Sequence, residues 1–194
     1  MNIQTSLYEG EEICLAPIDY EKDPEIESKW THDASYLRLL DAAPACPLSV
    51  EQVKKKYEEI EKEQEDSKSL IYFTIRKREA ECLIGFVKIY WIEWSNGSGL
   101  LQMGIGSPED RNHGYGSEAL KMVLRYAFDE CNLYRLTALL PEYNQAALHV
   151  FKKVGFIEEV RRREALWRDG CRWDLIHLGI LNGDWRKIQT KDQN

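Results

Sequence analysis

The segment from Leu101 to Leu120 combines an apolar run, a polar loop and two closely spaced glycines. Gly114 and Gly116 lack a Cβ, so the backbone can adopt positive φ there and a phosphate can approach the amides closely. Apolar residues recur at helical spacing after them, which places the glycines at a helix start, where free N–H groups and the helix dipole favour an anion. The pattern Arg-x-x-Gly-x-Gly predicts a pyrophosphate-binding loop, formed by Arg111, Asn112, His113, Gly114, Tyr115, Gly116 and Ser117.

The same glycines also fit a dinucleotide-binding fingerprint, because Gly114, Gly116 and Ala119 have the spacing Gly-x-Gly-x-x-Ala. That fingerprint needs a tight strand-to-helix turn early in a series of parallel strands. Here several polar residues separate the strand from the glycines, and too little chain follows Asn144 to build the second half of such a fold. A dinucleotide site is therefore disfavoured, as is a glycine-rich loop without a ligand.

A second motif is the stretch Asn144-Gln-Ala-Ala-Leu-His-Val-Phe-Lys-Lys-Val-Gly-Phe156. Together with the Arg111 loop, it resembles the acetyl-CoA site of the GNAT acetyltransferase superfamily, most closely the branch that acetylates the N-termini of ribosomal proteins. The resemblance implies acetyl-CoA as co-substrate and no metal. It also implies an α+β fold, with a mostly antiparallel twisted sheet of about seven strands flanked by about four helices.

The resemblance extends the cofactor site beyond the loop. The strand that precedes the loop would splay from its neighbour and present free N–H groups to the acyl group, while the asparagine at the helix start would contact the cofactor arm. These further cofactor-binding residues are Met103, Gly104, Ile105, Asn144, Ala147 and Phe151.

Amide formation from a thioester needs a neutral amine, donors for the developing oxyanion and a proton for the thiolate. The resembled family's proton-handling positions differ here: Phe151 replaces a common tyrosine, Ala147 a serine of the ribosomal branch, and Gln102 its glutamate. Gln102, Glu142 and Tyr143 remain as candidate catalytic residues. For Glu142 and Tyr143, a position on the solvent-exposed rim of the site is favoured over a catalytic role. Helical spacing places His149 on the surface.

Hydrophobic periodicity and turn residues predict the elements that position these motifs. Strands are expected at 12–18, 70–76, 82–94, 99–106, 135–140, 156–165 and 172–180. Helices are expected at 23–30, at 49–66 behind the capping box Ser49-Val-Glu-Gln52, at 115–130 and from Asn144. Residues 31–47 show no clean period and are expected to form a region of helix and loop. By resemblance, they form one wall of the acceptor site. Residues 1–186 are expected to form a single domain, followed by a disordered polar tail at 187–194.

The composition of the chain limits the classes of partner that it could bind. The chain has 194 residues and a net charge of −7, which argues against nucleic acid and favours a cationic partner. No apolar run is long enough for a membrane span, and the N-terminus lacks a secretion signal, so a cytoplasmic location is expected. The five cysteines are scattered and predict neither a disulfide framework nor a zinc site.

These observations predict an acyl-CoA-dependent N-acyltransferase that uses acetyl-CoA and a primary amine, such as a protein N-terminus, a polyamine or a small amine. A non-catalytic acyl-CoA-binding domain on the same fold is the alternative. The apolar strand at 175–180 would need protection at a sheet edge, for which a homodimer is one solution.

Overall fold

The computed structural model describes residues 6–192 and contains a seven-stranded sheet in the order β1-β2-β3-β4-β5-β7-β6. The strands are β1 (Ile13–Ala16), β2 (Ile71–Lys77), β3 (Leu83–Glu93), β4 (Ser98–Ile105), β5 (Arg135–Pro141), β6 (Ile157–Arg168) and β7 (Cys171–Leu181). All neighbours pair antiparallel except β4 and β5. The predicted α+β fold is confirmed. Residues 1–5, where no secretion signal was expected, and residues 193–194 of the expected tail lie outside the described residues.

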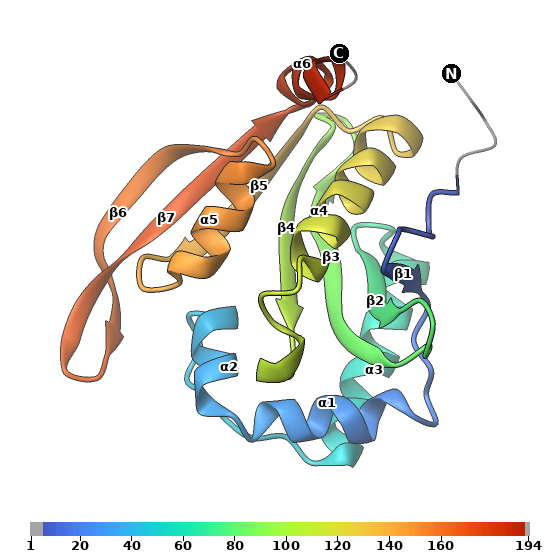
Figure 1. Ribbon diagram of the computed structural model, residues 1–194. Helices are drawn as coiled ribbons and strands as arrows, with labels where there is room; N and C mark the ends of the chain where they lie inside the picture. The colour runs from blue at the N-terminus through green and yellow to red at the C-terminus, as the bar shows by residue number, and fades with distance from the viewer. Residues whose placement is uncertain (1–5, 193–194) are drawn as a thin grey trace.

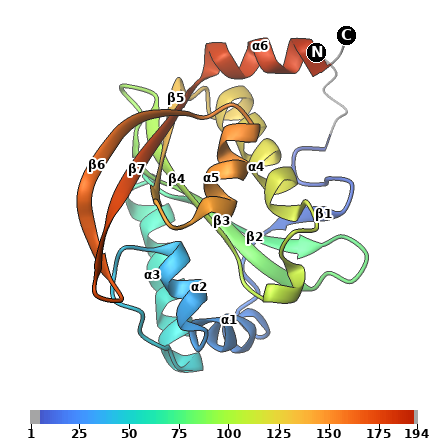
Figure 2. The same cartoon turned by 60° about the vertical axis from the view of Figure 1, so that its left-hand side comes forward.

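Helices cover both faces of the sheet (Figures 1 and 2). They are α1 (Asp23–Thr31), α2 (Ala34–Leu40), α3 (Val50–Asp66), α4 (Tyr115–Arg125), α5 (Gln145–Lys153) and α6 (Asn182–Asp192). In Figure 1, α4 and α5 lie in front of the sheet, α3 lies behind it, and α1 and α2 lie at its lower end. There are six such helices among the described residues rather than the four expected. The sequence predicts only a region of helix and loop where α2 lies, and it does not reveal α6.

The local signals explain most of these elements. Ser49 and Gln52 form the predicted capping box at the start of α3, whose Val53 and Tyr57 are fully buried against the sheet. The predicted helix at 115–130 exists as α4 followed by a π-helical turn at Tyr126–Glu130. On the opposite face from α3, buried residues of α4 pack with β5 and β7 in the main core, which includes Leu120, Val123, Leu136 and Ile176.

Helix α6 continues to Asp192, which corrects the expected disorder for residues 187–192. Trp185 is 4% exposed and its ring lies 6.5 Å from that of Phe128, while Arg186 pairs with Asp129 at 2.6 Å. Trp185 and the half-buried Ile188, three residues on, are the inward-facing apolar residues of an otherwise polar segment. Two such residues are too short a pattern to predict a helix.

The apolar strand at 175–180 is also not an edge, contrary to the expectation from sequence. It belongs to β7, which pairs with β5 on one side and with β6 on the other. The outer strand is β6, which carries exposed Ile157, Val160 and Trp167.

The two central strands separate along their length. β4 pairs with β5 at only three positions, of which the last is Leu100 with Thr137. Beyond that point β4 stays paired with β3 as far as Ile105, and β5 stays paired with β7 as far as Pro141. A gap therefore opens in the sheet without leaving either strand unsupported.

A buried ion pair joins α1 to β2, and breaking it tests the fold. Arg76 Nη2 lies 2.6 Å from Oδ2 of Asp23, whose side chain is fully buried, and burial raises the pKa of that carboxyl despite the arginine. An Arg76→Met variant should lose about 3–5 kcal/mol of unfolding free energy at pH 7, because it leaves a buried charge unpaired.

That loss should shrink as the pH falls through the raised pKa of Asp23, because protonation removes the unpaired charge. Calorimetric unfolding between about pH 4, near the ordinary pKa of a carboxyl group, and about pH 8 would measure this change. Lys29→Ala breaks the exposed Lys29–Glu25 pair and should cost less than about 1 kcal/mol. Equal losses in the two variants would contradict this account of the Asp23 pair.

Candidate functional site

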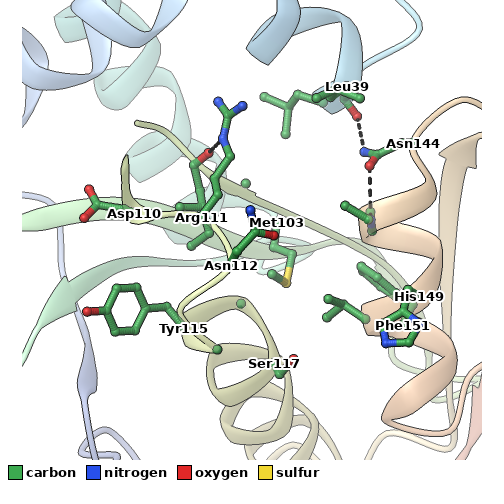
Figure 3. Close-up of a pocket in the computed structure, with 18 of the residues that line it drawn as sticks. Leu39, Met103, Asp110, Arg111, Asn112, Tyr115, Ser117, Asn144, His149 and Phe151 are labelled. Carbon is green, nitrogen blue, oxygen red and sulfur yellow. Dashed lines mark hydrogen bonds between the residues drawn. The ribbon is translucent and has the colours of Figure 1, made fainter. Parts of the chain in front are cut away.

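A cavity of about 770 Å³ lies where β4, the start of α4, α5 and α2 come together (Figure 3). It contains every predicted cofactor-binding residue except His113. Its lining is Tyr36, Leu39, Leu40, Met103, Gly104, Ile105, Asp110, Arg111, Asn112, Gly114, Tyr115, Gly116, Ser117, Asn144, Ala146, Ala147, His149, Val150, Phe151 and Lys153. The two sequence motifs therefore form the walls of one cavity.

The gap beside β4 exposes backbone donors to this cavity. Successive residues of a strand direct their backbone groups to opposite neighbours. Just before β4, Gly97 O accepts hydrogen bonds from Tyr134 N and Arg135 N, on the β5 side. Just after β4, Gly106 N donates to Ile84 O, on the β3 side. Odd-numbered residues of β4 therefore direct their backbone groups towards β5, and even-numbered residues towards β3. The amides of Met103 and Ile105 consequently face the gap, where β5 no longer pairs.

The loop after β4 turns into α4 through backbone conformations that suit an anion. A 3₁₀ turn at Pro108–Asp110 is followed by Asn112 at φ 65° and Gly114 at φ 89°, and α4 starts at Tyr115. The first helical bond runs from Glu118 N to Gly114 O at 3.0 Å, which leaves the amides of the first turn without helical acceptors. These donors open onto the cavity.

The two glycines of the loop serve different purposes. Gly114 is required by its positive φ, since a Cβ added there would meet nothing within 4 Å. A Cβ on Gly116 would instead lie 3.0 Å from Cε of Met103, in the narrow space between α4 and β4. The first glycine shapes the loop and the second keeps the cavity open.

Arg111 does not point at the anion-binding amides. Its Nε donates to Ile105 O at 3.3 Å (Figure 3). Its Nη2 donates to Gly106 O at 2.6 Å, and the guanidinium lies 3.7 Å from Asp33. The side chain therefore fastens the end of β4 and links it to the N-cap of α2.

Of the two acidic residues in this loop, Glu109 is exposed and does not line the cavity, and Asp110 lines it but is paired. Asp110 lies 2.6 Å from Nζ of Lys77, and this bond raises the pKa of the lysine. Lys77 also lies 5.9 Å from the centre of the Tyr115 ring. An anion at the loop would consequently meet an ion pair at this edge rather than an isolated carboxylate.

Three polar side chains hold the last turn of α2 over the cavity. Tyr143 Oη donates to Arg38 O at 2.8 Å, Asn144 Nδ2 to Leu39 O at 2.9 Å, and Gln102 Nε2 to Leu40 O at 3.0 Å. Asn144 also caps α5 by accepting from Ala147 N at 3.1 Å (Figure 3). Since a helix end leaves its last carbonyls without partners, these donors dock α2 onto β4 and α5. We call this set the α2 clamp.

Comparison with known proteins identifies the arrangement. A sequence model of the acetyltransferase (GNAT) domain matches residues 12–157, more than half of the chain. The chain belongs to the GNAT acetyltransferase family.

Two curated relatives and a crystal structure illustrate this membership. The uncharacterized N-acetyltransferase YnaD of Bacillus subtilis is 31% identical over 58% of this chain and 65% of its own length. YdaF of Bacillus subtilis, provisionally named a ribosomal N-acetyltransferase, is 29% identical over 40% of this chain and 42% of its own. The matches span less than two thirds of either relative. Spermidine N-acetyltransferase from Vibrio cholerae, solved with CoA and spermine, shares the fold at a TM-score of 0.79 and 19% identity, covering 91% of this chain and 99% of that one.

Within this GNAT fold, the three candidate catalytic residues do not line the cavity. Gln102 and Tyr143 belong to the α2 clamp, and Glu142 accepts Asp174 N at 3.2 Å and pairs with Arg161 at 3.0 Å. Glu142 and Tyr143 are half-buried, so the exposed rim expected for them is not what the structure has. Both are engaged in bonds between elements.

The remaining predicted residues divide by exposure. Phe151 is 2% exposed and packs on Phe156 with ring centres 5.0 Å apart, so the apolar side chain belongs to the core as well as to the cavity wall. His113 is exposed and stacks on Tyr115 at 5.6 Å. His149 is exposed as expected, but it also lines the cavity.

One wall of the cavity is formed by Tyr36, Leu39 and Leu40 of α2. These residues lie within residues 31–47, which the resemblance placed beside the acceptor, but the sequence did not single them out. Asp33 caps this helix through Ser35 N at 2.9 Å, and that capping residue was the available signal. Among residues 6–192, no group of three or more His, Cys, Asp and Glu side chains is arranged to hold a metal ion. Over the same residues, no helix is both long and apolar enough to cross a bilayer.

Gly116 provides a test of the cavity as the CoA site. A Gly116→Val variant should lose CoA binding, because its side chain would fill the space beside Met103 Cε and block approach to the α4 amides. Isothermal titration calorimetry with CoA measures the change. Gly183→Val, also a helical glycine but with nothing within 4 Å of an added Cβ, should bind like the parent protein. Unchanged affinity in a folded Gly116→Val protein would remove the cavity from consideration.

Proposed function

We propose that this chain is an acetyl-CoA-dependent N-acetyltransferase that moves the acetyl group to a primary amine by direct attack. The observation that carries the proposal is one cavity that joins the anion-binding amides of α4 to the free amides of the sheet gap. A thioester with a pyrophosphate at the other end of a long arm fits these two donor groups. Family membership supports the same reading.

In this proposal the first-turn amides of α4, with those of the loop before it, hold the CoA pyrophosphate. The arm passes between Met103 and α5, along Ala147 and Phe151, and the amides of Met103 and Ile105 stabilise the developing oxyanion. Lys153, at the end of α5, adds a cation to the cavity rim. Asn144 acts through the α2 clamp and the α5 cap, because both of its polar atoms already make these bonds.

For the acceptor we infer a low-pKa amine such as a peptide N-terminus. Relatives are named for both spermidine and ribosomal acetylation. Around α2, Asp169 pairs with Arg38, while Asp174 and Glu142 share Arg161 at 3.0 Å each, so each of these carboxylates already faces an arginine. Lys88 stands opposite Gln102 in the sheet, on the α2 face, and a lysine there disfavours a polycationic neighbour.

The proton chemistry follows from the acceptor. A thiol with a pKa of about 8.5 leaves tolerably as thiolate, so a dedicated acid adds little that positioning does not. An α-amine with a pKa near 8 is partly neutral at pH 7, whereas a lysine-like amine near 10.4 is almost fully protonated. We therefore propose transfer without a side-chain base, in the cytoplasm, with the amine losing its proton to solvent.

Activity measured with a panel of amines tests this function. With acetyl-CoA, N-terminal peptides, spermidine and small amines, CoA release should be fastest for peptides and should rise with pH as the amine deprotonates. Tyr143→Phe should loosen the α2 clamp and raise the KM for the amine, with kcat falling less than about tenfold, below the 10²–10⁴-fold expected of an acid or base. Phe151→Tyr should change kcat little.

Two results would contradict direct transfer. One is a more than hundredfold fall in kcat for Tyr143→Phe or Glu142→Gln with CoA binding intact, since proton-transfer groups contribute about 10²–10⁴-fold. The other is CoA binding without turnover for every amine. That outcome would favour the alternative, a non-catalytic acyl-CoA-binding domain. The replacement of the family's proton-handling residues by Phe151, Ala147 and Gln102 is consistent with that alternative.

We also propose a homodimer, whose interface is formed by the edge strand β6 rather than by β7. As the outer strand, β6 offers unpaired backbone groups, and Ile157 and Trp167 on it are 61% and 56% exposed. Light scattering across a wide concentration range should show twice the monomer mass. Val160→Lys on β6 should shift the mass towards monomer, and a constant monomer mass in the parent protein would refute the dimer.

A further inference from the structure

Tyr36 carries a buried hydroxyl that no part of the proposed function uses. The residue lies on α2, is 4% exposed and lines the cavity. Over residues 6–192, its Oη is buried without a hydrogen-bond partner. A buried donor left unpaired costs stability, and such groups in native proteins commonly mark a site where another molecule supplies the partner.

The hydroxyl lies against the stretch of β4 that lines the cavity. A Cβ built on Gly104 would lie 3.3 Å from Tyr36 Oη, so the hydroxyl stands directly over this residue of β4. Gly104 lies between Met103 and Ile105, whose amides face the gap. The tyrosine thus approaches from α2 the same stretch of strand at which the thioester would meet the amides.

The ring is held firmly in this position. It lies 6.1 Å from the ring of Trp30 on α1 and 6.0 Å from the guanidinium of Arg111. The α2 clamp fixes the turn of helix that follows. A donor held this way needs little reorganisation when charge develops beside it.

The environment also fixes the protonation state of the hydroxyl. Burial, and next the nearby Glu27 carboxylate, raise the pKa of Tyr36 well above its ordinary value, while Arg111 lowers it less. The group therefore stays a neutral O–H throughout the working pH range. It can donate a hydrogen bond, but it cannot act as a base and is a poor acid towards a thiolate.

We propose that Tyr36 is a catalytic residue whose hydroxyl donates a hydrogen bond to the thioester carbonyl oxygen, beside the amides of Met103 and Ile105. The inference rests on the proposed acetyl transfer. The amine lone pair forms the C–N bond while negative charge grows on the carbonyl oxygen. Collapse of this intermediate expels the C–S electron pair onto sulfur, and the proton lost by nitrogen reaches the thiolate through solvent. Tyr36 keeps its proton throughout.

Tyr36→Phe tests this role, because it removes the hydroxyl and keeps the ring. Loss of one oxyanion donor typically lowers kcat about 10²–10³-fold, so kcat for the best amine of the panel should fall by about 10²-fold. CoA affinity, the KM for the amine and the melting temperature should stay near those of the parent protein. The acetyl-CoA affinity should fall relative to that of CoA, since only the thioester offers the carbonyl oxygen.

Tyr72→Phe is the matched control. Tyr72 is 5% exposed and its hydroxyl is also buried, but it lies on β2 and does not line the cavity. This variant should keep full activity. Equal loss in both variants would show a general effect of removing buried hydroxyls and would overturn the proposal.

The outcomes separate this inference from the proposed function. A kcat within about threefold of the parent for Tyr36→Phe, against the 10²–10³-fold of a lost oxyanion donor, overturns the inference alone. So does a failure of that variant to fold, because the hydroxyl would then be structural. If the parent protein turns over no amine, the proposed function fails, and the ratio of acetyl-CoA to CoA affinity decides the inference: a ratio lowered in Tyr36→Phe supports it, and an unchanged ratio overturns it.

Discussion

The early end of pairing between β4 and β5 is the constraint on which the site depends. Parallel pairing stops at Leu100 and Thr137, yet each strand continues on its other side, β4 against β3 and β5 against β7. Unpaired backbone groups inside a protein are costly, so such a gap persists only where the flanking pairs hold it open. Since α4 follows β4 and α5 follows β5, the divergence of the strands also separates the two helices. One irregularity thus creates both the free amides and the space in front of them.

The short helix α2 closes this space from the opposite side. A helix of seven residues has little stability of its own, and its last carbonyls need partners. Gln102, Tyr143 and Asn144 supply them from β4 and from the start of α5. These contacts bind the wall beside the acceptor to the same two elements that line the cofactor side. A change in the position of α2 would therefore be felt at both substrates.

The predictable and unpredictable parts of the molecule differ in the range of the interactions that decide them. The strands, the capped helix α3 and the glycine loop follow from neighbours within a few residues, so the pattern shows them. The places of α2 and α6 depend on contacts between distant segments, such as Tyr143 with Arg38 and Trp185 with Phe128. The polar residues Gln102 and Tyr143 looked like candidates for proton chemistry because a sequence shows their type but not their partner. Tyr36 was overlooked for the converse reason, since nothing local distinguishes an unpaired hydroxyl from a packed one.

Charge acts on this site at two ranges, with different results. The net charge of −7 attracts cationic amines from a distance. Close to α2, however, Asp33, Asp169 and Asp174 already face arginines. On the same face of the sheet, burial lowers the pKa of Lys88, while the nearby Asp41 carboxylate raises it less. An amine drawn in as ammonium would find few unpaired carboxylates there to hold its charge. The neutral amine is the nucleophile, so a mouth that does not stabilise the ammonium lowers the cost of the deprotonation that must precede attack. Steering by the whole surface and neutrality at the mouth are therefore compatible, and together they favour amines that give up a proton readily.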